Sequence, residues 1–92
     1  MIRWDEAKRA ANLAKHGVDF TAAAAFDWDS ALVVEDTRFD YGEPRYQALG
    51  FIGQRLHMLV FTRIPDGFRI ISLRKANNRE VLFHEKSKDG SS

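Results

Sequence analysis

The chain has 92 residues, of which 45% are hydrophobic and 29% charged, with no cysteine and a formal net charge of +1. This length suits one domain, and the lack of cysteine excludes disulfide scaffolds, thiol nucleophiles and thiolate zinc sites. No apolar run approaches the roughly 20 residues that cross a bilayer, and no apolar stretch of a signal peptide follows the basic start. We therefore expect a cytoplasmic protein that does not associate with membranes.

The near-neutral total conceals an uneven distribution of charge. Residues 1–44 carry five basic and nine acidic side chains, a net charge of −4. Residues 45–92 carry nine basic and four acidic side chains, a net charge of +5. Such asymmetry favours a nucleic-acid surface or an oppositely charged partner, and an anionic substrate is expected to bind the second half of the chain.

The first half of the chain predicts a short strand followed by two helices. Residues 2–4 suit a strand. Asp5 is a suitable N-cap and Gly17 a natural C′ residue, so a helix is expected over residues 6–16. The apolar face of this helix is mostly alanine, which requires close packing against its neighbour. A second helix is expected over residues 20–26, where a run of alanines has high helix propensity.

From residue 31 onward the hydrophobic pattern changes to a period of two, which predicts strands. The short links between them imply an antiparallel meander. The four strands are expected at residues 31–36, 45–52, 55–63 and 68–75. A last helix is expected at about residues 78–85, where Asn77 and Glu80 form a capping-box pattern.

The predicted fold class is α+β, with the element order β-α-α-β-β-β-β-α. It consists of an antiparallel four-stranded meander with an additional short N-terminal strand and with helices packed on one face. The other face of the sheet would then be free for a ligand. Residues 1–85 would form the single domain, and residues 86–92 a flexible polar tail.

Basic side chains lie near the ends of the predicted strands. Nine of the 14 basic residues are arginine, whose planar fork binds phosphate bidentately. One interpretation of these arginines is a phosphate-binding rim. The other is a solvated sheet edge whose charges prevent aggregation, and composition alone favours this second interpretation. Strict alternation over residues 68–75 places Arg69 with Leu73 on one side and Arg74 with Ile70 on the other. The rim would consist of Arg45, Arg63, Arg69, Arg74 and Arg79.

Few other residues indicate a catalytic or binding role on their own. Glu43 and Arg45 flank a proline at the start of a predicted strand; they could orient a proton-transfer pair, although a salt bridge that fixes the loop is the simpler explanation. The simpler explanation of His16 is a favourable interaction with the dipole at the end of its helix, and a catalytic role is the second interpretation. The histidine spacing is not that of a metal site, and the sequence has no nucleophile elbow or phosphate-binding glycine loop. We therefore expect no metal and no cofactor.

A set of spaced motifs resembles the BrnT family of toxins. The chain begins with Trp4-Asp5-Glu6-Ala7-Lys8, followed by Asn12-Leu13 and by Lys15-His16-Gly17-Val18 with Phe20. It continues with Asp36, Glu43-x-Arg45 and Gly50, and closes with Arg69-Ile70-Ile71-Ser72-x-Arg74-Lys75-Ala76 and Arg79-Glu80. The resemblance covers nearly the whole chain up to residue 85. It departs from the family at three positions, where the family commonly has alanine, a basic residue and tyrosine: Leu73, Val81 and His84.

The resemblance implies a toxin of a type II toxin–antitoxin pair, similar in fold to the RelE-like ribonucleases, which cleaves RNA and so arrests translation. It also implies a small BrnA-type antitoxin with a ribbon-helix-helix DNA-binding domain. Operator DNA would be bound only through the complex of the two proteins. The alternative hypothesis is a nucleic-acid-binding or protein-interaction module without catalysis.

A metal-independent ribonuclease needs a base for the 2′-hydroxyl, a cation for the phosphorane and an acid for the 5′-oxygen. We predict Glu43 as the general base and place Arg45 and Arg74 at the scissile phosphate. Lys8 and His16, on the polar face of the first helix, are the remaining proton-transfer candidates. The predicted substrate-binding residues are Arg63, Arg69, Lys75 and Arg79.

Overall fold

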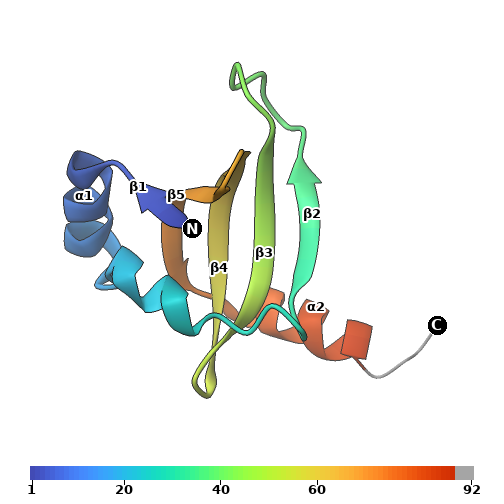
Figure 1. Ribbon diagram of the computed structural model, residues 1–92. Helices are drawn as coiled ribbons and strands as arrows, with labels where there is room; N and C mark the ends of the chain where they lie inside the picture. The colour runs from blue at the N-terminus through green and yellow to red at the C-terminus, as the bar shows by residue number, and fades with distance from the viewer. Residues whose placement is uncertain (89–92) are drawn as a thin grey trace.

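The computed structural model describes residues 1–88 and contains one mixed sheet of five strands (Figure 1). The strands occur in the order β1-β5-β4-β3-β2 across the sheet. Along the chain the elements are β1 (Ile2–Trp4), α1 (Glu6–His16), the 3₁₀ helix η1 (Phe20–Ala25), β2 (Leu32–Asp36), β3 (Arg45–Ile52), β4 (Arg55–Ile64), β5 (Gly67–Lys75) and α2 (Asn78–Lys88).

Local capping fixes α1 at the predicted residues. The Asp5 side chain accepts hydrogen bonds from the backbone N–H groups of Ala7 and Lys8. Gly17 adopts the left-handed conformation with φ of 72°, and its N–H donates to the carbonyl of Leu13 over 2.8 Å. These contacts satisfy backbone groups that a helix end leaves unpaired. The second predicted helix is a 3₁₀ helix and not an α-helix.

The antiparallel meander is confirmed for β2 to β5, but the sheet is not a four-stranded antiparallel one. β1 pairs with β5 in parallel, with Ile2 beside Phe68 and Trp4 beside Ile70. The sheet is therefore mixed and has five strands. The parallel pair forms because α1 and the rest of the chain intervene between β1 and β5, which allows a crossover that a short hairpin link does not.

The main core lies between the sheet and the layer formed by α1 and η1. Its largest fully buried side chains are Phe20, Leu59, Ile70 and Leu73. Gly50 allows the ring of Phe26 to approach β3 closely, since a Cβ at residue 50 would lie 2.5 Å from Phe26 Cζ. One face of the sheet is thus covered by α1 and η1, as predicted.

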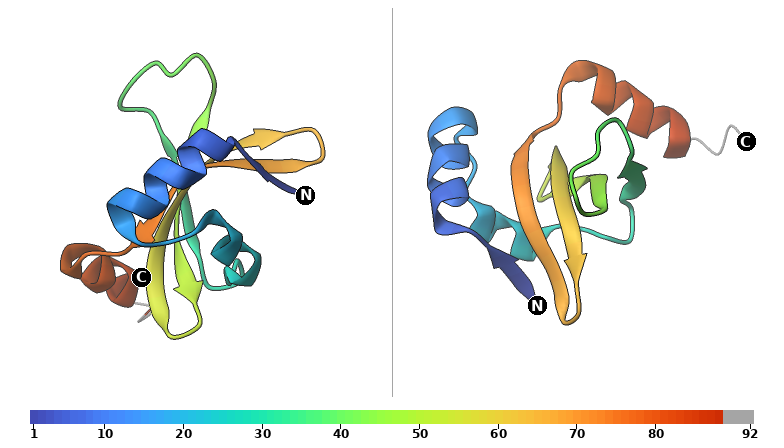
Figure 2. Two further views of the ribbon diagram at one scale, coloured as in Figure 1. Left: turned by 90° about the vertical axis from the view of Figure 1, so that its left-hand side faces the viewer. Right: turned by 90° about the horizontal axis from the view of Figure 1, so that it is seen from above.

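α2 lies apart from α1 and η1 (Figure 2) and packs at one end of the opposite face. There Val81 contacts a second apolar cluster of Leu49, Leu56, Met58 and Ala76. The prediction that helices pack on one face therefore holds for α1 and η1 and is corrected for α2. α2 continues to Lys88, three residues beyond its predicted end, so the first part of the predicted tail is helical. Residues 89–92 lie outside the described residues.

A β-bulge interrupts the alternation of β5. Val60 of β4 pairs with Ser72, but the next residue, Phe61, pairs with Ile70, so Ile71 is an extra residue in β5. The bulge places Ile70 and Leu73 on the same face, in the main core. It also places Arg69 and Arg74 together on the opposite face, beside Thr62 and Met58. The strict alternation predicted for residues 68–75 is therefore wrong at this point, because a bulge shifts the side chains that follow it by one position.

Asn12 occupies the part of the β5 edge that β1 does not reach. Its Nδ2 donates to the carbonyls of Leu73 over 2.7 Å and of Val18 over 3.0 Å, and its Oδ1 accepts from the N–H of Leu73. The side chain is buried. One amide thus replaces the hydrogen bonds of a neighbouring strand and ties α1 to the sheet.

Replacing Asn12 by alanine is expected to lower the free energy of unfolding by about 3 kcal/mol, since it leaves several buried backbone groups without a partner. Urea denaturation followed by tryptophan fluorescence measures the change. Lys15→Ala, an exposed substitution in the same helix, is the control and should stay within about 0.5 kcal/mol of the wild type. Equal stability of the two variants would contradict the role given to Asn12.

Among residues 1–88, no helix combines the length and the apolar composition that crossing a membrane requires.

Candidate active site

The sheet face opposite α1 and η1, between α2 and the loop of residues 37–44, is called the open face here. At its loop end the register pairs Asp36 with Arg45, and Thr62 with Arg69. At its α2 end, one row across the sheet contains Leu32, Leu49, Met58 and Arg74. Thr62 and Met58 are four residues apart on β4, so the two ends are separated by about 13 Å along the strands.

A carboxylate between two guanidinium groups forms the loop end of the open face. Glu43 accepts hydrogen bonds from Arg69 Nη2 at both oxygens, at 2.7 and 3.0 Å. Its Oε2 also lies 3.9 Å from Arg45 Nε. Thr62 Oγ1 donates to the carbonyl of Pro44 over 2.6 Å, which fixes the loop on the sheet beside Glu43. The structure thus brings together three predicted site residues, and Glu43 is held as an acceptor at the rim.

Arg45 offers an unused donor at the same place. Its guanidinium carbon lies 4.1 Å from the centre of the Tyr41 ring, a cation–π contact that holds the side chain. Its Nε atom is buried and has no hydrogen-bond partner among the described residues. A buried N–H without a partner is costly unless an anion or another acceptor completes it. Because this atom does not contact solvent, an anionic ligand could complete it only after the surrounding side chains move.

Asp36 organises the loop behind this cluster. Its buried carboxylate accepts two hydrogen bonds from the Arg38 side chain, both at 2.9 Å, and one from Tyr41 Oη at 3.0 Å. Gln47 Nε2 lies 3.4 Å from the same carboxylate. The hydrogen bonds from Arg38, above all, hold the pKa of Asp36 far below its usual range. Asp36 is therefore ionised at physiological pH and can only accept hydrogen bonds.

The low pKa of Asp36 predicts a pH-dependent contribution to stability. A carboxyl whose pKa is lowered by folding stabilises the folded state above its unfolded pKa of about 4, and this contribution is lost as the pH falls further. Asp36→Asn is expected to be less stable than the wild type at pH 7, and the difference should shrink below about pH 4. Urea denaturation at several pH values measures it, with Asp40→Asn in the same loop as control. A difference that stays constant down to pH 2 would contradict this interpretation.

At the α2 end, Arg74 is paired with a carboxylate that the sequence did not mark as a site residue. Arg74 Nη1 and Nη2 each donate to one oxygen of Glu80 over 2.8 Å. Glu80 also accepts from the N–H of Asn77 and donates its own N–H to the Asn77 side chain, which is the predicted capping box. The hydrogen bonds from Arg74 lower the pKa of Glu80. Glu80 thus holds both Arg74 and the first turn of α2.

α1 brings two further predicted residues to the edge of β5. Lys8 and His16 line a shallow pocket of about 270 Å³ together with Ile71 and Ser72. Burial lowers the pKa of His16, and the charges of Lys15 and Arg74 lower it further. His16 is therefore neutral at physiological pH, and it is suited to accept a proton rather than to donate one.

The remaining predicted residues divide between the two faces. Arg79 lines a pocket on the open face beside Glu80. Arg63 lies on the face covered by η1, where its guanidinium stacks over Tyr46 at 4.7 Å. The register also places Lys75 on that side, next to His57. The structure therefore separates Arg63 and Lys75 from the other predicted site residues.

Two groups of the open face were missed by the sequence reasoning. Glu80 was assigned only to the helix cap, and Gln47 was not considered as a site residue. The alternation of β3 was a usable signal for Gln47. Within residues 1–88, no three histidine, aspartate or glutamate side chains gather in a way that could hold a metal ion.

Comparison with known protein families identifies the family of the chain that forms this open face. A model described as the ribonuclease toxin BrnT of type II toxin–antitoxin systems matches residues 4–80. The chain belongs to the BrnT family. The match runs from β1 into the first turn of α2, so this region of the BrnT chain includes both arginine–carboxylate clusters of the open face. No individual curated protein matches the chain.

Proposed function

We propose that this BrnT-family chain is an endoribonuclease toxin that acts in the cytoplasm, cuts RNA on its open face and thereby arrests translation. The observation that carries the proposal is the Glu43 cluster, in which a carboxylate and a paired arginine meet a second arginine whose buried N–H has no partner within residues 1–88. A base and a cation beside each other are the minimum for attack of a 2′-hydroxyl on its neighbouring phosphate.

The roles follow from the positions of the side chains. Glu43 takes the proton of the 2′-hydroxyl, because each of its carboxylate oxygens has a second lone pair beside the one that it uses for Arg69. Arg45 and Arg69 stabilise the charge that develops on the phosphate. Arg74 approaches from the α2 end of the open face, and a phosphate between the two ends is within reach of both arginine side chains when these extend.

The proton for the 5′-oxygen comes from the α1 side of the site. Lys8 and His16 line the same small pocket at the β5 edge. Lys8 carries three donors, whereas His16 is neutral at physiological pH because burial lowers its pKa. Lys8 is therefore the better general acid of the two, and His16 is a second acceptor.

Cleavage is proposed not to require a metal ion. The carboxylates of Asp36, Glu43 and Glu80 are each paired with an arginine. Arginine supplies the positive charge that a divalent cation would supply in a two-metal nuclease. Attack by the 2′-hydroxyl would leave a 2′,3′-cyclic phosphate on the upstream fragment.

The partner is proposed to be a BrnA-type antitoxin with a ribbon-helix-helix domain, which binds operator DNA only as part of the complex. The open face carries Arg45, Arg69, Arg74 and Arg79, and an antitoxin with acidic side chains would be attracted to it. By covering this face it would exclude RNA. An antitoxin bound elsewhere would leave cleavage intact in the complex.

The test is incubation of the purified protein with single-stranded RNA in the presence of EDTA. We expect cleavage to continue and the fragments to end in 2′,3′-cyclic phosphate. Induced expression should stop growth, and co-expression of the antitoxin should restore it. Salt-dependent RNA binding without any cleavage, with a slope near 0.7 log units per contacted phosphate, would instead identify a non-catalytic RNA-binding module.

A further inference from the structure

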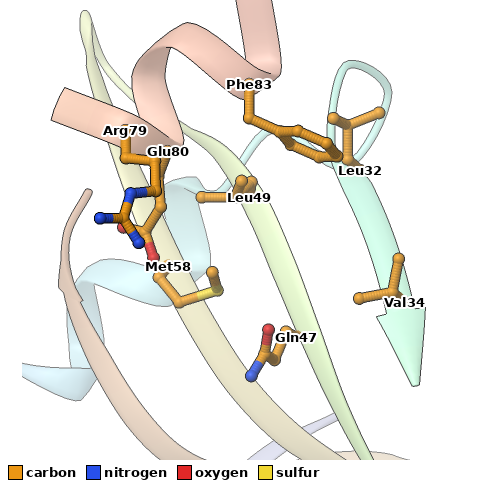
Figure 3. A pocket seen from close by; sticks show the side chains of 8 residues that line it. All are labelled: Leu32, Val34, Gln47, Leu49, Met58, Arg79, Glu80 and Phe83. Atoms are coloured by element: carbon orange, nitrogen blue, oxygen red, sulfur yellow. The ribbon is translucent and has the colours of Figure 1, made fainter. Parts of the chain in front are cut away.

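An apolar pocket of about 270 Å³ lies on the open face between the sheet and the beginning of α2 (Figure 3). Leu32, Leu49 and Met58 form its apolar lining from three neighbouring strands. Phe83 extends from α2 over its side near Leu32 (Figure 3). The roles proposed above for the catalytic groups do not use this pocket.

Phe83 is a large apolar side chain in contact with solvent. It is 58% exposed although it sits beside an apolar lining. An exposed aromatic ring next to positive charge is the usual platform on which an unpaired RNA base stacks. Arg79 lies one helical turn before Phe83 and lines the same pocket.

Gln47 is the polar side chain that β3 contributes to this pocket, and its amide has a defined orientation. Nε2 points to the Asp36 carboxylate, at 3.4 Å. Because Arg38 keeps Asp36 ionised, that carboxylate only accepts hydrogen bonds, and the amide nitrogen must face it. The carbonyl oxygen Oε1 is therefore directed to the side of Leu49 and Met58 (Figure 3).

The rim of the pocket is positively charged where a nucleic-acid backbone would pass. Arg79 and the Arg74–Glu80 pair stand on the α2 side. Arg45 precedes Gln47 by two residues on the same face of β3, toward the Glu43 cluster. A nucleotide whose base enters the pocket would thus have its phosphates between the two arginine-bearing ends of the open face.

We propose that this pocket is a nucleobase subsite, in which the base next to the scissile phosphate stacks on Phe83 and donates a hydrogen bond to Gln47 Oε1. The inference rests on the proposed ribonuclease function and adds a specificity to it. An acceptor held in the pocket favours bases with an exocyclic amino group, which are adenine, cytosine and guanine. Uracil offers a single N–H between two carbonyl oxygens, and these oxygens would repel Oε1.

The test is cleavage of a randomised single-stranded RNA pool, with the fragment ends sequenced. The wild type should disfavour uracil at one position next to the cut. Gln47→Met keeps the length of the side chain but removes the acceptor; it should still cleave, and the discrimination against uracil should fall by about 3- to 10-fold. Phe83→Ala should lower cleavage of all sequences by about tenfold through the loss of stacking.

Leu82→Ala is the matched control for Phe83→Ala. Leu82 is the preceding residue of α2 and is equally exposed, at 59% against 58%, but it does not line the pocket. Its cleavage rate and sequence profile should equal those of the wild type. Circular dichroism confirms that all variants are folded.

Several results would overturn the inference. A cleavage profile unchanged by Gln47→Met would exclude a base contact at residue 47. Variants at residues 47 and 83 that lose antitoxin binding but cleave as the wild type does would identify the pocket as a protein-docking groove. Wild-type protein that cuts no RNA would contradict the proposed function as well, whereas cutting with an unchanged profile leaves that function intact and removes only the base subsite.

Discussion

Glu43→Gln is expected to reduce the rate of RNA cleavage by between about 10² and 10⁴, the contribution of a positioned general base. Glutamine keeps the shape of the side chain and can still accept a hydrogen bond from Arg69, but it cannot take a proton from the 2′-hydroxyl. Single-turnover cleavage of a defined RNA by the purified variant measures the loss. The RNA affinity should be unchanged or higher, since one negative charge leaves the open face.

The control for Glu43→Gln is Asp66→Asn. Asp66 is also a carboxylate at the rim of the sheet and is paired with one arginine, Arg3, over 3.0 Å. Both partners of that pair are about half exposed, so its loss should cost little stability. Asp66→Asn should cleave at the wild-type rate. A folded Glu43→Gln protein that also cleaves at that rate would remove Glu43 from the catalytic site.

Arg74→Ala is expected to lower cleavage by at least about 10²-fold, the usual cost of removing one group that stabilises developing negative charge. Arg74→Lys should be intermediate, because lysine keeps the charge but loses the planar fork. The same single-turnover assay measures both variants. If Arg74 only anchors α2 through Glu80, the lysine variant should be as active as the wild type, whereas a role at the phosphate requires it to be slower.

The control for Arg74→Ala is Arg9→Ala, which removes one positive charge from α1. Arg9 pairs with Glu6 and Asp19, away from the open face. Comparison of the two variants separates a local effect at the site from a general loss of attraction for RNA. Undiminished cleavage by folded Arg74→Ala protein would exclude Arg74 from the reaction.

If Arg74 binds the scissile phosphate as proposed, the substrate must compete with the carboxylate of Glu80 for its guanidinium. The Arg74–Glu80 pair has good bidentate geometry, and Glu80 keeps a second hydrogen bond to Asn77 when Arg74 leaves it. The beginning of α2 would therefore stay capped if the guanidinium turned to a phosphate, so the release of Arg74 would not require unfolding of the helix.

Local sequence patterns predicted the helices and strands well, because the beginning and end of each element depend on a few neighbouring residues. Asp5 and Gly17 set the bounds of α1, and the strand β3 occupies the predicted residues. The parallel contact of β1 with β5 was not predictable in this way. It joins Ile2 to Phe68, which are distant along the chain, and no local pattern encodes such a pairing.

The site was predicted less completely than the fold for the same reason. Glu43 and Arg45 were recognised because they are adjacent to the same strand start, but the contact of Glu43 with Arg69 spans 26 positions. Arg63 and Lys75 had the right chemistry for phosphate and lie on the other face. Only the register of β4 and β5 decides which arginines share a surface, and the bulge changes that register.

The extra residue in β5 has a consequence for insertions and deletions. Ile71 separates two stretches of the strand that are out of phase, one with Ile70 in the core and one with Leu73 in the core. Deleting Ile71 would remove the extra residue and restore regular alternation, with Ile70 and Leu73 still in the core and Arg69 and Arg74 still on the open face. Deleting a residue of β4 opposite the bulge, such as Val60, would instead force one stretch of that strand to turn inside out. The loss of one residue should therefore be tolerated better at position 71 than at position 60.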